Sequence, residues 1–298
     1  MLARIQQSIA LTLLAGLLAS VAVGWVTDRP WVPLAYGALA LSGYAGALAA
    51  EFTWSFRSYE ADDPRRPSVS QLARAWAAES ATAPQVFLWR QPFRSCRYPD
   101  YLPDAGRGLR GVVLVHGFFC NRGLWNPWLL RLRAEGVPFI AVNLEPVLGA
   151  IDGYGLTIEA AARRLEQLTG LAPMIVGHSM GGLAARAWLA ETSDARWHRL
   201  VTIASPHAGT RLGVHGRGVN IEQMRFGSEW LSGLTSREPA QRRARFTCFW
   251  SHCDNIVFPA HSATLADADN RHLDETPHVK MVYHPAVLAE VLRSVGHP

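Results

Sequence analysis

A serine between two glycines, placed directly after an apolar run, constrains this chain more than any other feature. The stretch reads MIVGHSMGGLAARAWL over residues 174–189, with Ser179 two residues from both Gly177 and Gly181. The order predicts a strand, a sharp turn and a helix. Side chains beside such a serine must be small, and the serine stands exposed above the end of its strand. The pattern therefore predicts a nucleophile; the alternative is a chance glycine-rich turn.

Short apolar runs alternate with stretches of helical spacing through the rest of the chain. The expected strands, rich in β-branched residues, are 111–117, 138–144, 172–178, 199–206 and 245–251, with a short last strand at 271–275. The expected helices are 125–136, 157–170 with a Thr157 cap and a closing glycine, 180–192 and 284–295. Strands alternating with helices predict the α/β class, a mostly parallel sheet with helices on both faces.

A serine hydroxyl is a weak nucleophile, so it needs a base, and the base needs a carboxylate that orients it. When the serine lies in such a strand–turn–helix, the chain order is serine, then acid, then histidine. Asp254 follows the expected strand 245–251 by a few residues, in SHCDNIVFP, and is the predicted acid. Its rivals Asp267, Asp269 and Asp274 lie in segments typical of a surface.

Five histidines follow the predicted acid: His261, His272, His278, His284 and His297. His278 falls between the last expected strand and the last helix, and it is the predicted base. His284, at the start of that helix, is the alternative, although its position is more typical of a helix cap or a rim residue.

The oxyanion of the reaction needs backbone N–H donors. One donor is expected at Met180, directly after the nucleophile, and the other at Phe118, in VHGFFCNRG after the first strand. His116 precedes the serine, so the chain order argues against a catalytic role for it. His178 is expected to pack beside the turn.

These pieces resemble the α/β-hydrolase superfamily, and within it the lipases and esterases, over roughly residues 85 to 298. The matching motifs are HGF, GHSMGG, TIASPHAGT and DNIVFP, and the stretches NLEPVLGAIDGY and PHVKMV resemble bacterial membrane-associated lipase-like hydrolases. The chain departs from the family at DETPH, where glycines often precede the histidine. The resemblance implies hydrolysis of carboxylic esters without a cofactor, and we find no spacing typical of metal ligands.

Two uncharged runs open the chain, from 5 to 27 and from 30 to 50, each near the length of about 20 residues that a membrane helix needs. They predict a transmembrane hairpin, 1–57, with small residues Ser42 and Gly46 at the helix contact. A signal peptide followed by a core helix is the alternative, but we see no clear cleavage site. Arginines before the first span and after the second favour both ends inside, with the catalytic domain in the cytoplasm at a bacterial inner membrane.

The remaining chain divides into a connector, 58–108, and a catalytic domain, 109–298. In the connector we expect an amphipathic helix at 68–80 and an edge strand at 84–94. An insertion around 207–240 interrupts the alternation and is a candidate lid. Its apolar residues are expected either in the face of that lid or in the core: Met224, Phe226, Trp230 and Leu231.

The net charge of +5 comes almost entirely from arginine, without the clustered basic motif that nucleic-acid binding needs. The four cysteines show no metal spacing and are expected to be reduced, with a bridge between Cys248 and Cys253 left open. The sequence thus predicts a membrane-anchored serine hydrolase acting on lipid-like esters. The alternatives are an acyltransferase with the same triad and an inactive lipid-binding or scaffold protein. The oligomeric state is not predicted.

Overall fold

The computed structural model describes residues 1–60, 63 and 65–296 and contains a parallel six-stranded sheet. Its order is β2-β1-β3-β4-β5-β6, and every neighbouring pair is parallel. The predicted α/β fold class is confirmed. The strands are β1 (Val112–Val115), β2 (Phe139–Ala141), β3 (Met174–His178), β4 (Leu200–Ile203), β5 (Phe246–Trp250) and β6 (Asp269–His272).

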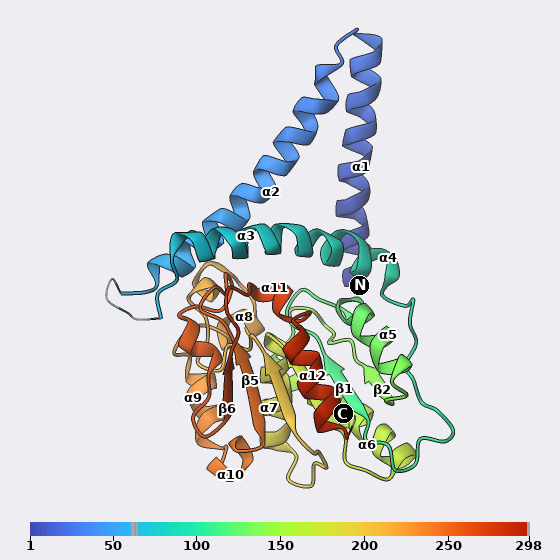
Figure 1. The fold of residues 1–298 in the computed structure, drawn as a ribbon, viewed down its shortest axis with the longest axis vertical. Helices are drawn as coiled ribbons and strands as arrows, with labels where there is room; N and C mark the ends of the chain where they lie inside the picture. Colours follow the sequence, from blue (N-terminus) through green and yellow to red (C-terminus); the bar gives the residue numbers. More distant parts are fainter. Residues whose placement is uncertain (61–62, 64, 297–298) are drawn as a thin grey trace.

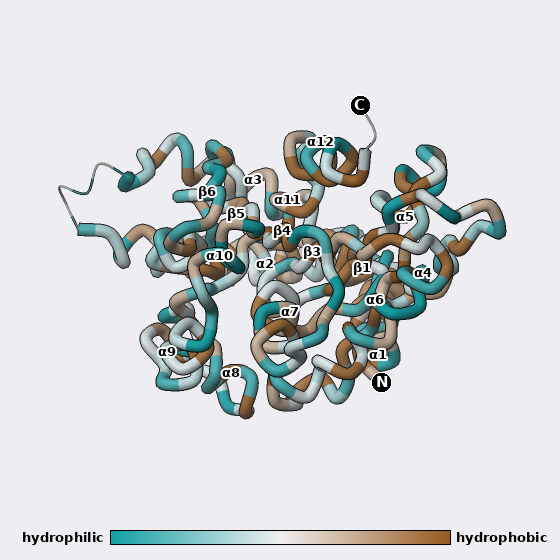
Figure 2. Tube along the Cα trace, turned by 90° about the horizontal axis from the view of Figure 1, so that it is seen from below, coloured by the Kyte–Doolittle hydropathy of each residue, from teal (hydrophilic) through white to brown (hydrophobic). Residues whose placement is uncertain are grey.

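Helices cover both faces of the sheet, as Figure 2 shows from below. Alternate residues of β1 enter opposite cores, because successive side chains of a strand point to opposite faces. Val113 and Val115 pack with the helices α6 and α7, whereas Val112 and Leu114 pack with α5 and α12. This burial on both sides explains the continuous apolar runs of the sequence. The four helices are α5 (Asn126–Ala134), α6 (Gly155–Thr169), α7 (Met180–Glu191) and α12 (Pro285–Ser294).

Helix α6 begins two residues before the expected cap. A 3-10 turn, Ile151–Tyr154, leads directly into it, so Thr157 lies inside the first turn and caps nothing. Its C-terminal end is as expected, because Gly170 adopts a φ of 74° and closes the helix in the left-handed conformation.

Two long apolar helices, α1 (Leu2–Val26) and α2 (Trp31–Arg57), project together from the sheet domain (Figure 1). Both are long and apolar enough to cross a membrane. The expected contact at Ser42 and Gly46 is wrong, because both residues are exposed and a Cβ on Gly46 would meet nothing within 4 Å. The helices instead approach at Gly16, beside the ring of Tyr36, and splay apart toward the domain.

The connector is helical throughout its middle. Helix α3 (Val69–Pro84) starts with a capping box between Ser68 and Gln71 and continues through a π-helical turn, Gln85–Arg90, into α4 (Gln91–Arg94). The expected edge strand at 84–94 is therefore wrong.

The physical reason is that the connector residues pair with the hairpin and the domain rather than with a strand. The buried Gln91 side chain accepts hydrogen bonds from the Gln6 side chain and from the Asn121 backbone N–H. Val86, from the same apolar run, is buried in the hydrophobic core between the sheet and α5.

The insertion between β4 and β5 consists of short helical pieces: a 3-10 turn (Arg211–His215), α8 (Val219–Gln223), α9 (Glu229–Ser236) and α10 (Ala240–Arg243). A fully buried ion pair ties its end to the helix after the nucleophile turn, with Arg186 Nη2 2.6 Å from Glu238 Oε2. All four cysteines are free, so Cys248 and Cys253 form no bridge.

Candidate active site

The turn between β3 and α7 places Ser179 in a strained conformation, with φ 54° and ψ −125°. Both flanking glycines are required by packing. A Cβ on Gly177 would lie 2.5 Å from the Gly182 backbone nitrogen, and one on Gly181 would collide with the Val115 carbonyl oxygen. A non-glycine residue at positive φ costs energy that the surroundings must offset, and such strain is concentrated at functional sites.

The predicted acid and base are brought together. Asp254 follows β5, and its Oδ1 accepts hydrogen bonds from the backbone N–H groups of Ile256 and Val257, both at 2.8 Å. His278 begins the short helix α11 (His278–Met281), and its Nδ1 lies 3.0 Å from Asp254 Oδ2. Both side chains are buried.

The Asp254 carboxylate fixes the state of the imidazole. A carboxylate only accepts hydrogen bonds, so Nδ1 of His278 carries the proton and Nε2 has the lone pair of a base. Burial lowers the pKa of His278. The charge of Asp254 and its hydrogen bond act in the opposite direction and outweigh burial, so that the net shift is upward.

The base lies beside the serine turn. The ring of His178, next to Ser179, packs against the ring of His278 with centroids 4.7 Å apart, and His178 Nε2 is 3.3 Å from the His278 carbonyl oxygen. In the described part of the chain no hydrogen bond joins Ser179 Oγ to the imidazole. Such bonds are often long without substrate and tighten in the complex.

The two expected oxyanion donors flank the serine. Phe118 and Ser179 line the same cavity, and a Cβ on the preceding Gly117 would lie 2.8 Å from Ser179 Cβ. Met180 is the first residue of α7, where backbone N–H groups have no partner within the helix. Among the described residues, neither amide donates to any acceptor, so both remain free for an anion.

The cavity at Ser179 has a volume of about 230 Å³ and is almost wholly apolar. Of the four candidate lid residues, Met224 lines it. Trp230 and Leu231 pack on the core around α7, and Phe226 lines a neighbouring cavity. The other lining residues come from the loop after β1, the chain after β4 and the Asp254 loop: Phe118, Pro206, Thr210, Leu212, Gly213, Gly216, Ile221, Ile256 and Val257.

A family model described as the alpha/beta hydrolase family matches residues 112–295, more than half of the chain. The chain belongs to the α/β-hydrolase family. Two lipases are among the solved structures that share its fold. The mature Bacillus licheniformis lipase BlEst2 is 15% identical, with a TM-score of 0.56 over 65% of this chain and 95% of that one. Aspergillus fumigatus lipase B is 19% identical, with a TM-score of 0.57 over 69% of this chain and 57% of that one. No curated protein gives a significant sequence match.

The rival acids of this α/β hydrolase lie at its surface. Each is exposed and has another partner: Asp267 pairs with Arg243, Asp269 with Arg271 and Asp274 with His272. Among the other histidines, His284 caps α12 by accepting the Ala286 N–H at 3.2 Å. His297 lies outside the described residues.

His116 is a structural residue of the hydrolase domain. It is buried, and its Nε2 accepts the backbone N–H of Leu144 at 3.0 Å, so that Nδ1 carries the proton and donates to the Gly117 carbonyl oxygen at 2.9 Å. Burial lowers its pKa to about 4, which keeps the ring neutral.

The connector holds a buried carboxylate that was not expected from the sequence. Glu79, on α3, is 1% exposed, and its two oxygens accept the backbone N–H groups of Val279 at 2.8 Å and Lys280 at 3.1 Å. These groups belong to the helical turn that His278 begins. Burial raises the pKa of Glu79 to about 7. Its sequence signal is weak: Glu79 lies at helical spacing from Ala75 and the other buried residues of α3, which places it on the buried face of that helix.

The end of α2 is hydrogen-bonded to the loop after β5 that carries Asp254. Ser55 Oγ donates to the Asp254 carbonyl oxygen at 2.7 Å, and Asn255 Nδ2 donates to Glu51 Oε2 at 2.7 Å. Asn255 Oδ1 in turn accepts the His278 backbone N–H at 3.3 Å. The last turns of the hairpin are thus linked through hydrogen bonds to both members of the acid–base pair.

One group of side chains has ligand atoms close enough for a metal ion. Among the described residues, the ligand atoms of His252, His272 and Asp274 lie within 4.8 Å of one another. The two rings are stacked, and His252 Nδ1 is 2.6 Å from His272 Nε2, the distance of a direct hydrogen bond. Arg66 lines the same cavity, and its positive charge opposes a cation there. We therefore assign no metal to this group.

Proposed function

We propose that this α/β hydrolase cleaves carboxylic esters with Ser179 as nucleophile, His278 as base and Asp254 as the orienting acid. The observation that carries the proposal is the buried, hydrogen-bonded pair of His278 and Asp254 beside the strained turn of Ser179. The family and the fold of its neighbours support hydrolase chemistry in general.

The reaction proceeds in two halves. Ser179 Oγ attacks the acyl carbon while His278 Nε2 takes the hydroxyl proton, and the proton then passes to the leaving alcohol. Water, activated by the same imidazole, next attacks the acyl-serine and releases the acid. Asp254 stabilises the imidazolium in both halves. Each lost oxyanion donor typically costs about 10²- to 10³-fold in kcat, which is the contribution assigned to the N–H groups of Phe118 and Met180.

The substrate we propose is a lipid-like ester at a membrane. The apolar walls of the cavity at Ser179 suit an acyl chain. The exposed apolar side chains of α1 and α2 need an apolar environment, and a bilayer supplies it. Residues 1–57 would anchor the protein in a bacterial inner membrane, with the domain 109–298 in the cytoplasm.

Hydrolysis of p-nitrophenyl butyrate by the full chain in dodecyl maltoside micelles tests the proposal. We expect Ser179→Ala to remove nearly all turnover while its thermal unfolding stays close to that of the wild type. Near-normal turnover by the folded variant would contradict the assignment of the nucleophile.

A further inference from the structure

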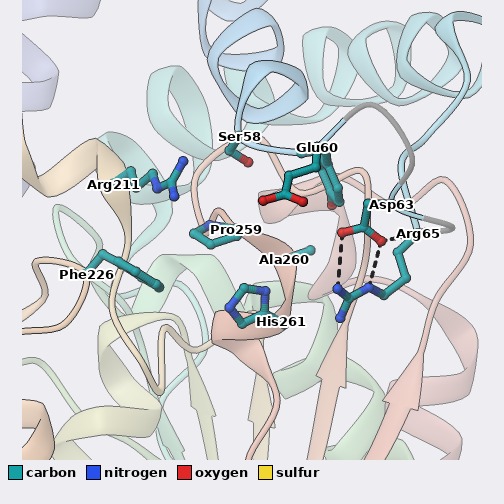
Figure 3. A pocket seen from close by; sticks show the side chains of 10 residues that line it. Ser58, Glu60, Asp63, Arg65, Arg211, Phe226, Pro259, Ala260 and His261 are labelled. Atoms are coloured by element: carbon teal, nitrogen blue, oxygen red, sulfur yellow. Dashed lines mark hydrogen bonds and ion pairs between the residues drawn. The ribbon is translucent and has the colours of Figure 1, made fainter.

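A second cavity lies at the base of the membrane hairpin (Figure 3). Its volume is about 470 Å³, and three segments far apart in the sequence enclose it. The first segment directly follows α2, so in a membrane-anchored chain it lies at the level of the lipid head groups. The lining residues are Ser58, Tyr59, Glu60, Asp63, Arg65, Arg211, Phe226, Pro259, Ala260 and His261.

This cavity shares a wall with the apolar cavity at Ser179. Thr210 and Leu212 line the apolar cavity, whereas Arg211, between them, lines the polar one. The wall is held by hydrogen bonds to the acid loop: the Arg211 N–H donates to the Phe258 carbonyl oxygen at 3.0 Å, and Thr210 Oγ1 donates to that of Ile256 at 2.5 Å. An apolar and a polar compartment are therefore adjacent.

Two opposite charges in the polar cavity have no partner of their own. Asp63 and Arg65 neutralise each other, with Oδ1 3.0 Å from Nε (Figure 3). Within the described residues, Arg211 and Glu60 make no ion pair or side-chain hydrogen bond, and the Arg211 guanidinium lies only near the ring of Phe226, at 5.6 Å. The cavity thus presents one free cation and one free anion among the residues described.

Arg211 is the basic group of the cavity that can bind an anion. Burial lowers the pKa of His261, and the charges of Arg65 and Arg211 lower it further. The charge of Asp63 raises it, but the net shift is downward. The ring is therefore kept neutral by its surroundings, and the guanidinium of Arg211 is the group left to bind an anion. A guanidinium matches phosphate oxygens in charge and in fork geometry.

We propose that this cavity binds the head group of a zwitterionic phospholipid, with the phosphate at Arg211 and the ammonium at Glu60. The acyl ester of the same lipid reaches Ser179, and its chain fills the apolar cavity. The inference rests on the proposed ester hydrolase function, which it extends to a substrate class. Water and the phospholipid then give a fatty acid and a lysophospholipid.

Binding can be tested separately from catalysis in the full-length Ser179→Ala chain in dodecyl maltoside micelles. Isothermal titration calorimetry would compare dihexanoyl phosphatidylcholine, dihexanoylglycerol and inorganic phosphate. We expect the phosphatidylcholine to bind best. Arg211→Gln should weaken its binding about tenfold or more, because a charge-assisted hydrogen bond is lost. Binding of dihexanoylglycerol should not change.

Two further variants sharpen the test. Glu60→Gln should weaken the binding of dihexanoyl phosphatidylcholine more than that of dihexanoyl phosphatidylglycerol, which has no ammonium. Arg164→Gln, the matched control, removes an exposed arginine on α6 outside the cavity and should leave every affinity unchanged.

Three results would overturn the head-group site: equal affinity for phosphatidylcholine and dihexanoylglycerol, no effect of Arg211→Gln, or inorganic phosphate binding as tightly as the lipid. Hydrolysis of p-nitrophenyl butyrate by the wild-type chain is measured beside these titrations. Absent hydrolysis with intact phospholipid binding would contradict the proposed function and leave the binding site standing.

Discussion

Glu79→Gln tests whether the connector helix supports the catalytic histidine. Glu79 accepts two backbone hydrogen bonds from the turn that His278 begins. Glutamine keeps one acceptor oxygen but turns an NH₂ group toward the second backbone N–H, which is then buried without a partner. An unsatisfied buried group costs about 1–3 kcal/mol, so we expect the free energy of unfolding to fall by about that amount. Chemical denaturation of the full chain in micelles measures it.

The same substitution should change the pH dependence of activity. The pKa of His278 is lowered by burial and raised by Asp254 and then by Glu79, so loss of the Glu79 charge lowers it. Only the neutral imidazole is a base, and activity therefore rises with pH through this pKa. Glu79→Gln should move the acid limb of kcat/KM to lower pH. A role in packing alone would reduce stability and leave the limb in place.

The assay is hydrolysis of p-nitrophenyl butyrate between pH 5 and 9. Glu191→Gln, at an exposed position at the end of α7, is the control for loss of one negative charge. Support of His278 by the Glu79 charge would be contradicted if Glu79→Gln left the acid limb where it was, or moved it to higher pH, while Glu191→Gln behaved like the wild type.

Three more contacts around the site can be tested by substitution. Ser55→Ala should lower kcat on the soluble ester a few-fold, because it removes a hydrogen bond of about 1 kcal/mol to the acid loop; an unchanged kcat would mean that the loop is held without the hairpin. Glu238→Ala should reduce the free energy of unfolding by about 3–5 kcal/mol, since it leaves a buried arginine unpaired; chemical denaturation checks it, and a change below 1 kcal/mol would contradict it. His278→Ala should lose several orders of magnitude in kcat, whereas His284→Ala should lose little; the reverse ranking in two folded variants would make His284 the base.

The positions of the predicted site residues could be read from the sequence because they depend on local order. The spacing around Ser179 specifies a strand, a turn and a helix, and the carboxyl ends of parallel strands meet at one edge of the sheet. Asp254 and His278 each follow a strand at that edge, and the structure places them 3.0 Å apart. Their catalytic roles remain a prediction.

The contacts that the sequence did not disclose join segments far apart in the chain. Glu79 reaches a turn 200 residues away, and Ser55 reaches Asp254, 199 residues away. No local pattern specifies such a pair. The edge strand expected at 84–94 was wrong for another reason. β-branched and aromatic residues in a short run fit a strand and a buried helix equally well. Its helical state depends on packing against α1 and the core.

Covalent labelling by a fluorophosphonate would identify the nucleophile directly. The wild-type chain in micelles would be treated with the probe, digested and analysed by mass spectrometry. We expect one modified residue, Ser179, and loss of labelling in His278→Ala, because the serine then has no base. Labelling of a different residue, or full labelling of Ser179 without His278, would contradict this assignment.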